Sequence, residues 1–387
     1  MRIGIDVTAA ICQGGGIGRY TRELIQALVA IDHSNRYRFF SARPPQVVSV
    51  APVPRPIPVA PNTRYHPAPL DERWLYRLWY RLRLPLPVQW FTGPLDLFHS
   101  PDFVLPPVSG GTPTLLTVHD LSFVHYPETF PPRLVAYLNQ VVPRSIERAS
   151  HVLADSKATK KDLVGLWQVP ADKITVLYSG VSQAFQPVTD SDKLAAVRQK
   201  YNLGQAPYLL SVGTIQPRKN YQMLIRAFQP VAARWPHNLV IAGGKGWLND
   251  DMLAEISRHG LDGRVHFIGF AEDGHLPALY SAATLFVFPS LYEGFGLPLL
   301  EAMACGVPVI TSNASSLLEV AGKLPDGRET AVALSPQQPA AWTEAINGLI
   351  ADPEQRAELV AAGLQQARRF TWSQAARQLL EIYSAVR

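Results

Sequence analysis

Short apolar runs rich in β-branched and aromatic residues alternate with amphipathic segments along most of the chain. The apolar runs of the first half lie at residues 2–7, 37–40, 114–118, 151–154 and 174–177. Helical periodicity predicts helices over residues 18–31, 133–148 and 157–166. This alternation is typical of a parallel β-sheet with helices on both faces. Residues 44–69 are rich in proline, and their interleaved valines favour short edge strands and loops.

The same alternation begins again after a break at residues 185–192, where neither the strand period nor the helix period is present. Apolar runs then follow at residues 208–212, 239–242, 265–268, 285–288 and 307–311. Three helical stretches end the chain, near residues 340–350, 353–368 and 373–386. A chain of 387 residues has room for two or three domains. We therefore predict two α/β domains, residues 1–185 and residues 186–370, with a C-terminal helix after them.

Composition narrows the function classes. Hydrophobic residues make up 47% of the chain and charged residues 17%, which supplies two cores and excludes a disordered protein. The net charge of +5 fits a small anionic ligand or an acidic membrane surface, and no nucleic-acid-binding motif is present. Cys12 and Cys305 lie in different halves without metal-ligand spacing, which favours a reducing compartment. Asp6 interrupts the first apolar run, so we expect no signal peptide, and no run is long enough to span a membrane.

A glycine-rich loop, Gly14-Gly15-Gly16-Ile17-Gly18, separates the first strand from the first helix. Glycines let backbone N–H groups approach phosphate oxygens, and the helix N-terminus adds a favourable dipole. The spacing is not G-x-G-x-x-G, because Thr21 takes the last position, and no acidic residue follows where a ribose needs one. The loop is therefore either a phosphate contact or a flexible turn, and a dinucleotide site is disfavoured.

Two adjacent cations, Arg218 and Lys219, follow the strand at 208–212 and precede a helix. A planar guanidinium and a compact ammonium can together hold a diphosphate. Cations are unfavourable at a helix N-terminus, and an anionic ligand offsets that cost. We therefore favour a ligand-binding pair over a solvated pair on a surface turn. Asn220, which follows them, has the residue type of an N-cap.

The most specific motif follows the strand at 285–288 and extends from Glu293 through Gly294-Phe295-Gly296-Leu297 to Glu301. The two glycines free backbone N–H groups, and Pro298 suits the first turn of a helix. Glu293 then lies in the loop and Glu301 about one turn into the helix, so both carboxylates can face one pocket. Because Glu301 stands among leucine, alanine and methionine residues, we expect it to be buried with a polar partner.

His119 and Asp120 follow the strand at 114–118. Ligands of open α/β sheets bind at the carboxyl ends of strands, which favours a functional role for both residues. A single histidine is often structural instead, so the position alone leaves both interpretations of His119 open.

The acidic pair Asp190 and Asp192 has the D-x-D spacing of a metal-binding motif. The pair lies in the predicted linker, directly before a helix that begins near Lys193, where aspartate is a favoured N-cap. We therefore interpret Asp190-Ser191-Asp192 as a helix cap and predict no metal.

Residues 72–84 combine arginines with tryptophan and tyrosine at helical spacing. Such a helix can lie at a membrane interface, with its aromatic rings at the headgroups and its arginines on anionic lipid. It can also pack on the first sheet with its arginines in water. The sequence leaves both interpretations open and favours the packed helix.

Together these motifs resemble the retaining glycosyltransferases of family 4, which have the GT-B fold. The resemblance covers essentially the whole chain and is firmest over residues 211–228 and 265–321, where the E-x7-E pattern of Glu293 and Glu301 is its specific part. Within the family, the chain looks most like bacterial mannosyltransferases of O-antigen, capsule or exopolysaccharide assembly. The resemblance implies two Rossmann-like domains that face a central cleft, with the last helix, residues 371–387, returning to the first domain.

The resemblance also implies roles for individual residues. Glu301 is expected to hold the ribose hydroxyls, Glu293 to lie beside the transferred sugar, and Arg218 and Lys219 to neutralise the diphosphate. The other expected donor-binding residues of the second domain are Gly294, Phe295, Gly296, Leu297 and, near the base, Phe270.

The resemblance assigns the first domain to the acceptor side. Three residues of this domain complete the predicted site. Gly16 is expected to touch the diphosphate, His119 to reach the donor sugar, and Asp120 to shape the acceptor side. The expected catalytic residues are therefore His119, Arg218, Lys219 and Glu293.

The implied reaction moves a hexose, with mannose favoured, from a nucleoside-diphosphate sugar to a glycan or lipid-linked acceptor. GDP-mannose is the favoured donor, and UDP-sugars stay open. The leaving group needs stabilisation of negative charge, which Arg218, Lys219 and helix N-termini supply without a metal or other cofactor. The family retains the anomeric configuration, and the sequence shows no evident covalent nucleophile. We expect a cytoplasmic protein, with peripheral contact to the inner face of an anionic membrane left open.

Other functions fit the same architecture. One is a sugar-nucleotide epimerase or a phosphorylase on a similar two-domain fold, and another is a catalytically silent protein that binds sugar nucleotides. The presence of Arg218, Lys219, Glu293 and Glu301 argues against silence. An NAD-dependent oxidoreductase is disfavoured by the broken glycine pattern.

Overall fold

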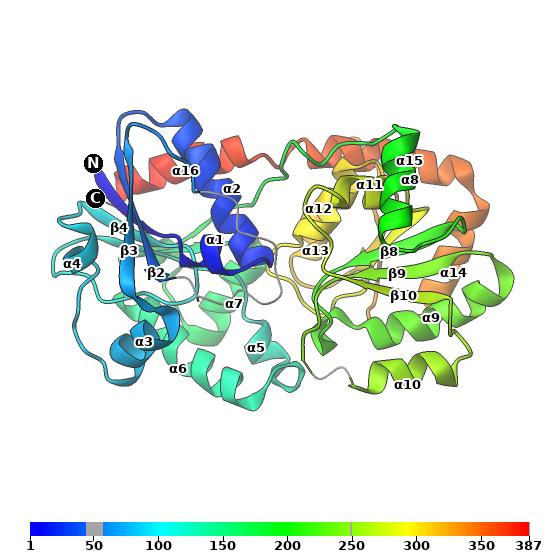
Figure 1. Cartoon of the computed structure of the whole chain (residues 1–387), viewed down its shortest axis with the longest axis horizontal. Coiled ribbons are helices and arrows are strands. Elements are labelled where there is room, and N and C mark those ends of the chain that lie inside the picture. The colour runs from blue at the N-terminus through cyan, green and yellow to red at the C-terminus, as the bar shows by residue number, and fades with distance from the viewer. Residues whose placement is uncertain (44–56, 248–249, 387) are drawn as a thin grey trace. The chain divides into compact units, whose positions relative to one another are not determined.

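The computed structural model describes residues 1–43, 57–247 and 250–386. Packing divides the chain into two compact units (Figure 1). Unit 1 comprises Met1–Val124, Arg133–Gly180 and Thr371–Arg387, and unit 2 comprises His125–Pro132 and Val181–Phe370. The sequence placed the boundary after residue 185, whereas the packing places it after Gly180.

The short segment His125–Pro132 belongs to unit 2, although the sequence places it in the first half. The Trp247 indole Nε1–H donates to the carbonyl oxygen of Thr129 at 2.8 Å. The His125 ring stacks on Tyr292 with ring centroids 5.1 Å apart. These contacts between distant parts of the chain leave no periodic signal in the sequence.

Unit 1 contains a seven-stranded parallel sheet in the order β3-β2-β1-β4-β5-β6-β7. Its strands are β1 (Arg2–Asp6), β2 (Arg36–Arg43), β3 (Thr63–Asp71), β4 (Leu97–Ser100), β5 (Thr114–Val118), β6 (His151–Ala154) and β7 (Ile174–Val176). The inner strands are buried almost throughout, as expected when helices cover both faces. Strand β3 holds Pro67 and Pro69 and lies at the edge, where proline removes no ladder hydrogen bond. Residues 44–56 of the predicted proline-rich edge lie outside the described residues.

Helices cover both faces of this sheet (Figure 1). The helices of unit 1 are α1 (Thr8–Cys12), α2 (Gly16–Ile31), α3 (Glu72–Tyr76), α4 (Gln89–Thr92), α6 (Pro132–Arg148), α7 (Lys157–Trp167) and α16 (Trp372–Ala385), and α5 (Ser122–His125) ends at its border with unit 2. Helix α16 packs beside α2, so the C-terminal helix belongs to the same unit as the N-terminal strand and helix. A Cβ atom on Gly18 would lie 2.0 Å from the carbonyl oxygen of Gln13, so only glycine allows the close approach of α1 and α2.

The basic aromatic segment forms α3 and then continues as a π-helical turn, Arg77–Arg81. Leu75 and Trp79 are buried against the unit, as expected for a packed helix. Trp74 is 52% exposed and Leu82 62% exposed, so apolar side chains also face outward. Among the described residues, no helix has the length and apolar character needed to cross a membrane.

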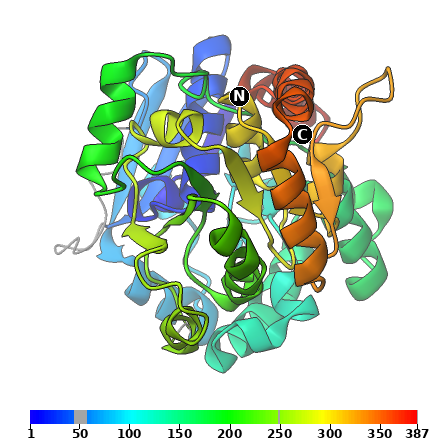
Figure 2. The ribbon, with the colours of Figure 1, turned by 90° about the vertical axis from the view of Figure 1, so that its right-hand side faces the viewer.

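Unit 2 contains a six-stranded parallel sheet in the order β10-β9-β8-β11-β12-β13. Its strands are β8 (Tyr208–Val212), β9 (Asn238–Ala242), β10 (Val265–Gly269), β11 (Leu285–Phe288), β12 (Val309–Ser312) and β13 (Val332–Leu334). The helices are α8 (Ser191–Lys200), α9 (Tyr221–Arg234), α10 (Asp250–Arg258), α11 (Leu276–Ser281), α12 (Leu297–Ala304), α13 (Leu317–Ala321), α14 (Pro339–Ala351) and α15 (Pro353–Ala367). Figure 2 shows α9 and α14 side by side on one face of this sheet, and their apolar residues join the strands in one core cluster.

Candidate active site

The first strand of unit 2, β8, lies between β9 and β11 in the sheet. The chain runs from β8 to β9 and β10 on one side and then returns to β11 on the other. The carboxyl ends of β8 and β11 therefore form a topological switch point, where open α/β sheets bind ligands. Residues 213–220 follow β8 and residues 289–296 follow β11, so both predicted motifs reach this place.

Three charged side chains from these two loops form a buried ion cluster, which we call the triad: Arg218, Lys219 and Glu293. The Lys219 Nζ atom lies 2.6 Å from Glu293 Oε1, and the Arg218 Nη1 atom lies 3.0 Å from Glu293 Oε2. The three side chains are only 9–12% exposed, so this is not a solvated surface pair. Two cations and one carboxylate give the triad a net charge of +1 in a place with little water.

The triad keeps Glu293 ionised. Burial by itself raises the pKa of the Glu293 carboxyl, but the neighbouring Arg218 and Lys219 charges outweigh it and lower the pKa to about 2. The Lys219 ammonium also lies 4.9 Å from the centre of the Phe288 ring, a favourable distance for a cation–π contact. Each charge thus has partners within the protein.

Hydrogen bonds fix the loop that carries Glu293. Its backbone N–H donates to Ser315 Oγ at 2.9 Å, and Ser316 Oγ donates to its carbonyl oxygen at 2.8 Å. The Arg218 guanidinium donates to the carbonyl oxygen of Tyr292. A charged group held by such contacts keeps its position when a ligand arrives, which is what a binding site requires.

Helix α12 begins directly after the loop. Gly296 stands before it with φ of 103°, and a Cβ atom there would lie 2.7 Å from Leu317. The left-handed backbone therefore favours glycine, and a larger residue would also have to displace the Leu317 side chain. The first N–H groups of a helix lack intrahelical acceptors, so this N-terminus favours negative charge nearby. The expected donor-binding residues on this turn are Gly294, Phe295, Gly296 and Leu297.

Glu301 lies further along α12 and is only 2% exposed. Its Oε2 atom accepts a hydrogen bond of 3.0 Å from the Tyr280 hydroxyl, which α11 supplies. The prediction that Glu301 is buried with a polar partner is confirmed. Its role in holding ribose stays a prediction.

Phe270 and Asn220, which the sequence also singled out, lie in the same unit. Phe270 follows β10, which is the edge strand two positions from β8, and is partly buried. Asn220 stands at the N-terminus of α9, but its side chain does not cap that helix. The Asn220 amide donates instead to the carbonyl oxygens of Pro289 and Pro336, at 3.2 and 2.8 Å. Asn220 therefore ties the β8 loop to the β11 loop.

In unit 1, His119 forms a buried ion pair with Asp155. Strands β5 and β6 pair with Val118 opposite Ala154, so the residues that follow them are neighbours. The His119 Nδ1 atom lies 2.7 Å from Asp155 Oδ2, and the Nε2 atom lies 3.1 Å from the carbonyl oxygen of Pro101. Both partners offer oxygens that can accept from the ring, an arrangement that favours protons on both nitrogens and a charged imidazole.

The pH dependence of stability should report this pair. Burial by itself lowers the pKa of His119, yet Asp155, Asp102 and the Pro101 carbonyl raise it to about 9, above its ordinary value of 6.5. A raised pKa in the folded state gives stability that is full below pH 6.5 and is lost as the pH rises through 9. We expect the unfolding free energy of the wild-type protein to fall more steeply over this window than that of His119→Asn. The unfolding free energies of both proteins are measured by urea unfolding at pH 6, 7.5 and 9. If they change equally with pH, the imidazole of His119 is not charged.

The other two predicted residues of unit 1 have simpler surroundings. Asp120 Oδ1 accepts hydrogen bonds from the backbone N–H and the hydroxyl of Ser122, at 2.9 and 2.6 Å. Gly16 is exposed and is the first residue of α2. The hydrogen bonds of the His119 ring and the Asp120 carboxylate join residues of unit 1. The roles of His119 and Gly16 toward a donor, and of Asp120 on the acceptor side, therefore stay predictions.

The D-x-D pattern is a helix cap. The Asp190 side chain accepts from the backbone N–H groups of Asp192 and Lys193, at 3.0 and 3.3 Å, at the N-terminus of α8. This confirms the predicted cap. Over residues 1–43, 57–247 and 250–386, no group of three or more histidine, cysteine or acidic side chains could hold a metal ion.

Sequence reasoning missed several partners of the predicted residues. Asp155 directly follows the strand at 151–154, so the rule that placed His119 at a strand end could also have found it. Tyr280, Ser315 and Ser316 give no local signal, because their contacts join residues that are distant in the sequence.

Two family profiles match successive parts of the chain. The profile described as Glycosyltransferase Family 4 matches residues 14–185, and that described as Glycosyl transferases group 1 matches residues 195–366. O-antigen chain mannosyltransferase B of Escherichia coli is 33% identical over 377 residues and covers 95% of each chain. Serotype-specific mannosyltransferase WbdA of Escherichia coli is 32% identical over 253 residues, which are 63% of this chain and 30% of that protein.

Solved structures share the fold over the whole chain. Sucrose-phosphate synthase from Thermosynechococcus elongatus aligns with a TM-score of 0.76 at 23% identity and covers 100% of this chain and 99% of its own. Anabaena Alr3699/HepE in complex with UDP and glucose aligns with a TM-score of 0.71 at 19% identity and covers 100% of both chains. At these identities the similarity shows the architecture alone.

Proposed function

The chain belongs to the family 4 and group 1 glycosyltransferases, and we propose that it transfers mannose from GDP-mannose to a glycan or lipid-linked acceptor. We further propose that transfer retains the anomeric configuration and needs no metal. The relatives named as mannosyltransferases support the choice of sugar.

The triad carries this proposal. It lies at the switch point of unit 2 with a net charge of +1, beside the N-terminus of α12. Within the triad, Glu293 balances one of two positive charges, and buried cations are stabilised by further negative charge. A diphosphate brought to this place supplies that charge, because its oxygens suit the Arg218 fork and the Lys219 ammonium.

The same residues can serve the transfer step. The bond between the anomeric carbon and the phosphate oxygen breaks, and the nucleoside diphosphate leaves with the bonding electrons. The acceptor hydroxyl oxygen forms the new bond on the same face, and its proton passes to the leaving oxygen. Arg218 and Lys219 would stabilise the negative charge on phosphate, and the ionised Glu293 would stabilise positive charge at the anomeric carbon.

Thermal stability in the presence of nucleotides tests this function. We expect GDP and GDP-mannose to raise the melting temperature of the purified chain, because a ligand that binds only the folded state stabilises it. The shift should persist in EDTA, and UDP, ADP and inorganic phosphate at equal concentration should give smaller shifts. A shift only with UDP compounds would reassign the donor. No shift with any nucleotide, or one abolished by EDTA, would contradict the proposed metal-free site.

Contact with an anionic membrane is a separate prediction. The exposed arginines Arg73, Arg77 and Arg81 stand beside the exposed Trp74 and Leu82. Each basic residue near an anionic surface contributes about 1 kcal/mol to the free energy of membrane binding. Apolar side chains strengthen binding further when they insert into the interface. We expect the protein to sediment with vesicles that contain phosphatidylglycerol and to stay in solution with phosphatidylcholine alone.

Charge substitutions make the membrane prediction specific. Changing Arg73, Arg77 and Arg81 together to glutamine should weaken binding at least roughly tenfold. The matched control changes two exposed arginines of α6, Arg133 and Arg144, to glutamine and should bind as the wild type does. If the wild-type protein stays in solution with anionic vesicles, the prediction of membrane contact for residues 72–84 is wrong. The cytoplasmic location stays a prediction.

A further inference from the structure

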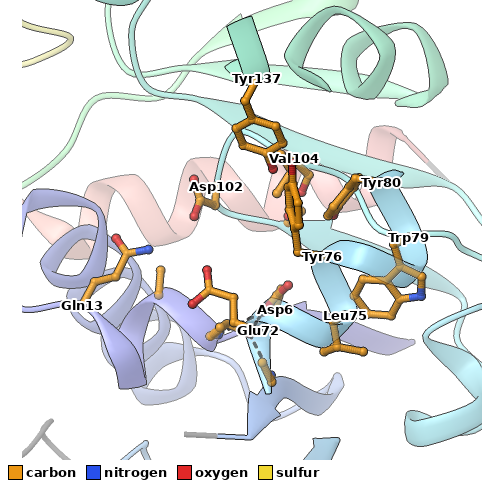
Figure 3. Close-up of a pocket in the computed structure, with 14 residues that line it drawn as sticks. Asp6, Gln13, Glu72, Leu75, Tyr76, Trp79, Tyr80, Asp102, Val104 and Tyr137 are labelled. Carbon is orange, nitrogen blue, oxygen red and sulfur yellow. Dashed lines mark hydrogen bonds between the residues drawn. The ribbon is translucent and has the colours of Figure 1, made fainter. Parts of the chain in front are cut away.

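A cavity in unit 1 lies at the counterpart of the switch point in unit 2. Strand β1 lies between β2 and β4, and the chain visits β2 and β3 before it returns to β4. Asp6 ends β1, and Asp102 follows the end of β4 by two residues. A cavity of about 90 Å³ opens between them, lined also by Glu72 and by Tyr137 of α6 (Figure 3). Crevices at such points are where open α/β sheets bind ligands.

Aromatic rings form one wall of this cavity. Tyr76 and Tyr137 meet edge to face with ring centroids 4.9 Å apart, and Tyr80 and Trp79 stand beside them (Figure 3). The Trp79 indole N–H donates to the carbonyl oxygen of Leu86, so only its apolar ring serves the cavity. Over the part of the chain that the structure describes, no hydrogen bond engages the hydroxyls of Tyr76, Tyr80 and Tyr137. The wall thus offers flat aromatic rings together with tyrosine hydroxyls that can form hydrogen bonds to a ligand.

Carboxyl groups form the other wall. Burial, with smaller contributions from the charges of Asp102 and Glu72, raises the pKa of Asp6 to about 6, although two hydrogen bonds from Thr8 act to lower it. Burial likewise raises the pKa of Asp102 and of Glu72. Three carboxyls that already disfavour one another's charge would repel a further anion. They can accept hydrogen bonds from hydroxyl groups, and when protonated they can donate them.

The carboxyl wall disfavours an anionic occupant, and the rings and hydroxyls suit one that is rich in hydroxyls and partly apolar. A sugar ring meets the requirement, since its C–H face packs on aromatic rings and its hydroxyls bond to carboxyl and phenol groups. The cavity has room for several water molecules, and so for the hydroxyl-bearing edge of one ring.

We propose that this cavity binds the uncharged terminal hexose of the acceptor glycan and excludes acceptors that carry a phosphate there. The inference rests on the proposed function, because it assumes that the chain glycosylates a sugar acceptor. In this proposal the selectivity for an uncharged acceptor sugar comes from the carboxyl and aromatic walls of the cavity. The donor site does not determine this selectivity.

Saturation-transfer NMR on the full chain tests this site without turnover. The probes are methyl α-D-mannopyranoside and mannose 6-phosphate, each titrated alone. We expect the neutral glycoside to bind and the phosphate to bind at least roughly fivefold more weakly. Glu72→Gln and Tyr137→Phe should each weaken binding of the glycoside by roughly fivefold or more, because the first replaces a carboxyl acceptor by a weaker amide and the second removes a hydroxyl. The matched control is Glu147→Gln, an exposed glutamate of α6 outside the cavity.

Separate outcomes distinguish the two proposals. Absence of glycoside binding to the wild type, equal binding of mannose 6-phosphate, or unchanged binding in both variants would each overturn the acceptor pocket. Folding of the variants is checked by their melting temperatures, which should match that of Glu147→Gln within a few degrees. The GDP-induced stabilisation is measured on the same samples. If GDP binds and the glycoside does not, only the acceptor pocket is wrong; if no nucleotide binds, the proposed function fails by itself.

Discussion

Replacing Arg218 with alanine is expected to lower kcat/KM for sugar transfer by roughly a hundred- to a thousandfold. Other enzymes lose about as much when one hydrogen-bonding group that stabilises a developing negative charge is removed. Arg218 lies at the switch point, 3.0 Å from Glu293, and its guanidinium can hold two phosphate oxygens at once. Arg218→Lys should lose less, because it keeps the charge but not the planar fork. Steady-state kinetics with donor varied at fixed acceptor measures both changes.

A matched control separates this effect from a general loss of positive charge. Arg226→Ala removes an arginine of α9 that is 54% exposed and paired with Glu255, away from the β11 loop. It should leave kcat/KM within about twofold, because Arg226 lies in neither loop of the site. If Arg218→Ala retained wild-type kcat/KM, the triad would have no part in holding the leaving group.

Glu293→Gln is expected to destabilise unit 2 by roughly 3–5 kcal/mol, because removing one partner of a buried pair leaves the other charges uncompensated. Here two cations, Arg218 and Lys219, lose their common carboxylate. Nucleoside diphosphate should raise the melting temperature of the variant more than that of the wild type, since its charge replaces the missing one. Differential scanning calorimetry with and without GDP measures both effects.

The pH dependence gives this prediction a definite sign. The pKa of Glu293 is lowered in the folded state to about 2, so its stabilising contribution is present above its ordinary pKa and is lost as the pH falls toward 2. The difference in stability between the wild type and Glu293→Gln should therefore narrow below about pH 4. Glu344→Gln, an exposed glutamate of α14, serves as control and should match the wild type. A variant as stable as this control at pH 7 would contradict the buried triad.

Much of the fold could be predicted from local patterns. The strands predicted at 114–118, 151–154, 208–212 and 285–288 have those bounds in the structure, because more than half of the residues in each run are apolar. Two parallel-sheet α/β domains are confirmed, as are the family and the enzyme class.

Elements without such runs were missed. Strand β4 is only four residues long and includes His99 and Ser100, and β13 is only three residues long. Helix α1 is a five-residue turn before the glycine loop, and its existence depends on packing against α2. Short elements of this kind are stabilised by their neighbours more than by their own sequence, so a single-sequence pattern does not report them.

For the site, sequence position predicted where the residues lie but not what they contact. The strand-end rule placed Arg218, Lys219 and Glu293 at one edge of the sheet. It could not show that Glu293 pairs with both cations, since Lys219 and Glu293 are 74 positions apart in the sequence. The partner of His119 is likewise 36 positions away. Pairing across strands depends on sheet order and register, which alternation of apolar and polar residues leaves undetermined.

Product analysis tests the central claim most directly. Purified protein is incubated with GDP-mannose and a neutral mannoside acceptor in EDTA, and NMR follows the anomeric signals with time. The account predicts one equivalent of GDP for each new mannoside, with the α-configuration of the donor retained, and no product with Arg218→Ala in the same period. Isomerised donor without a new glycoside would show an epimerase, and unchanged donor under conditions where GDP binds would contradict transfer altogether.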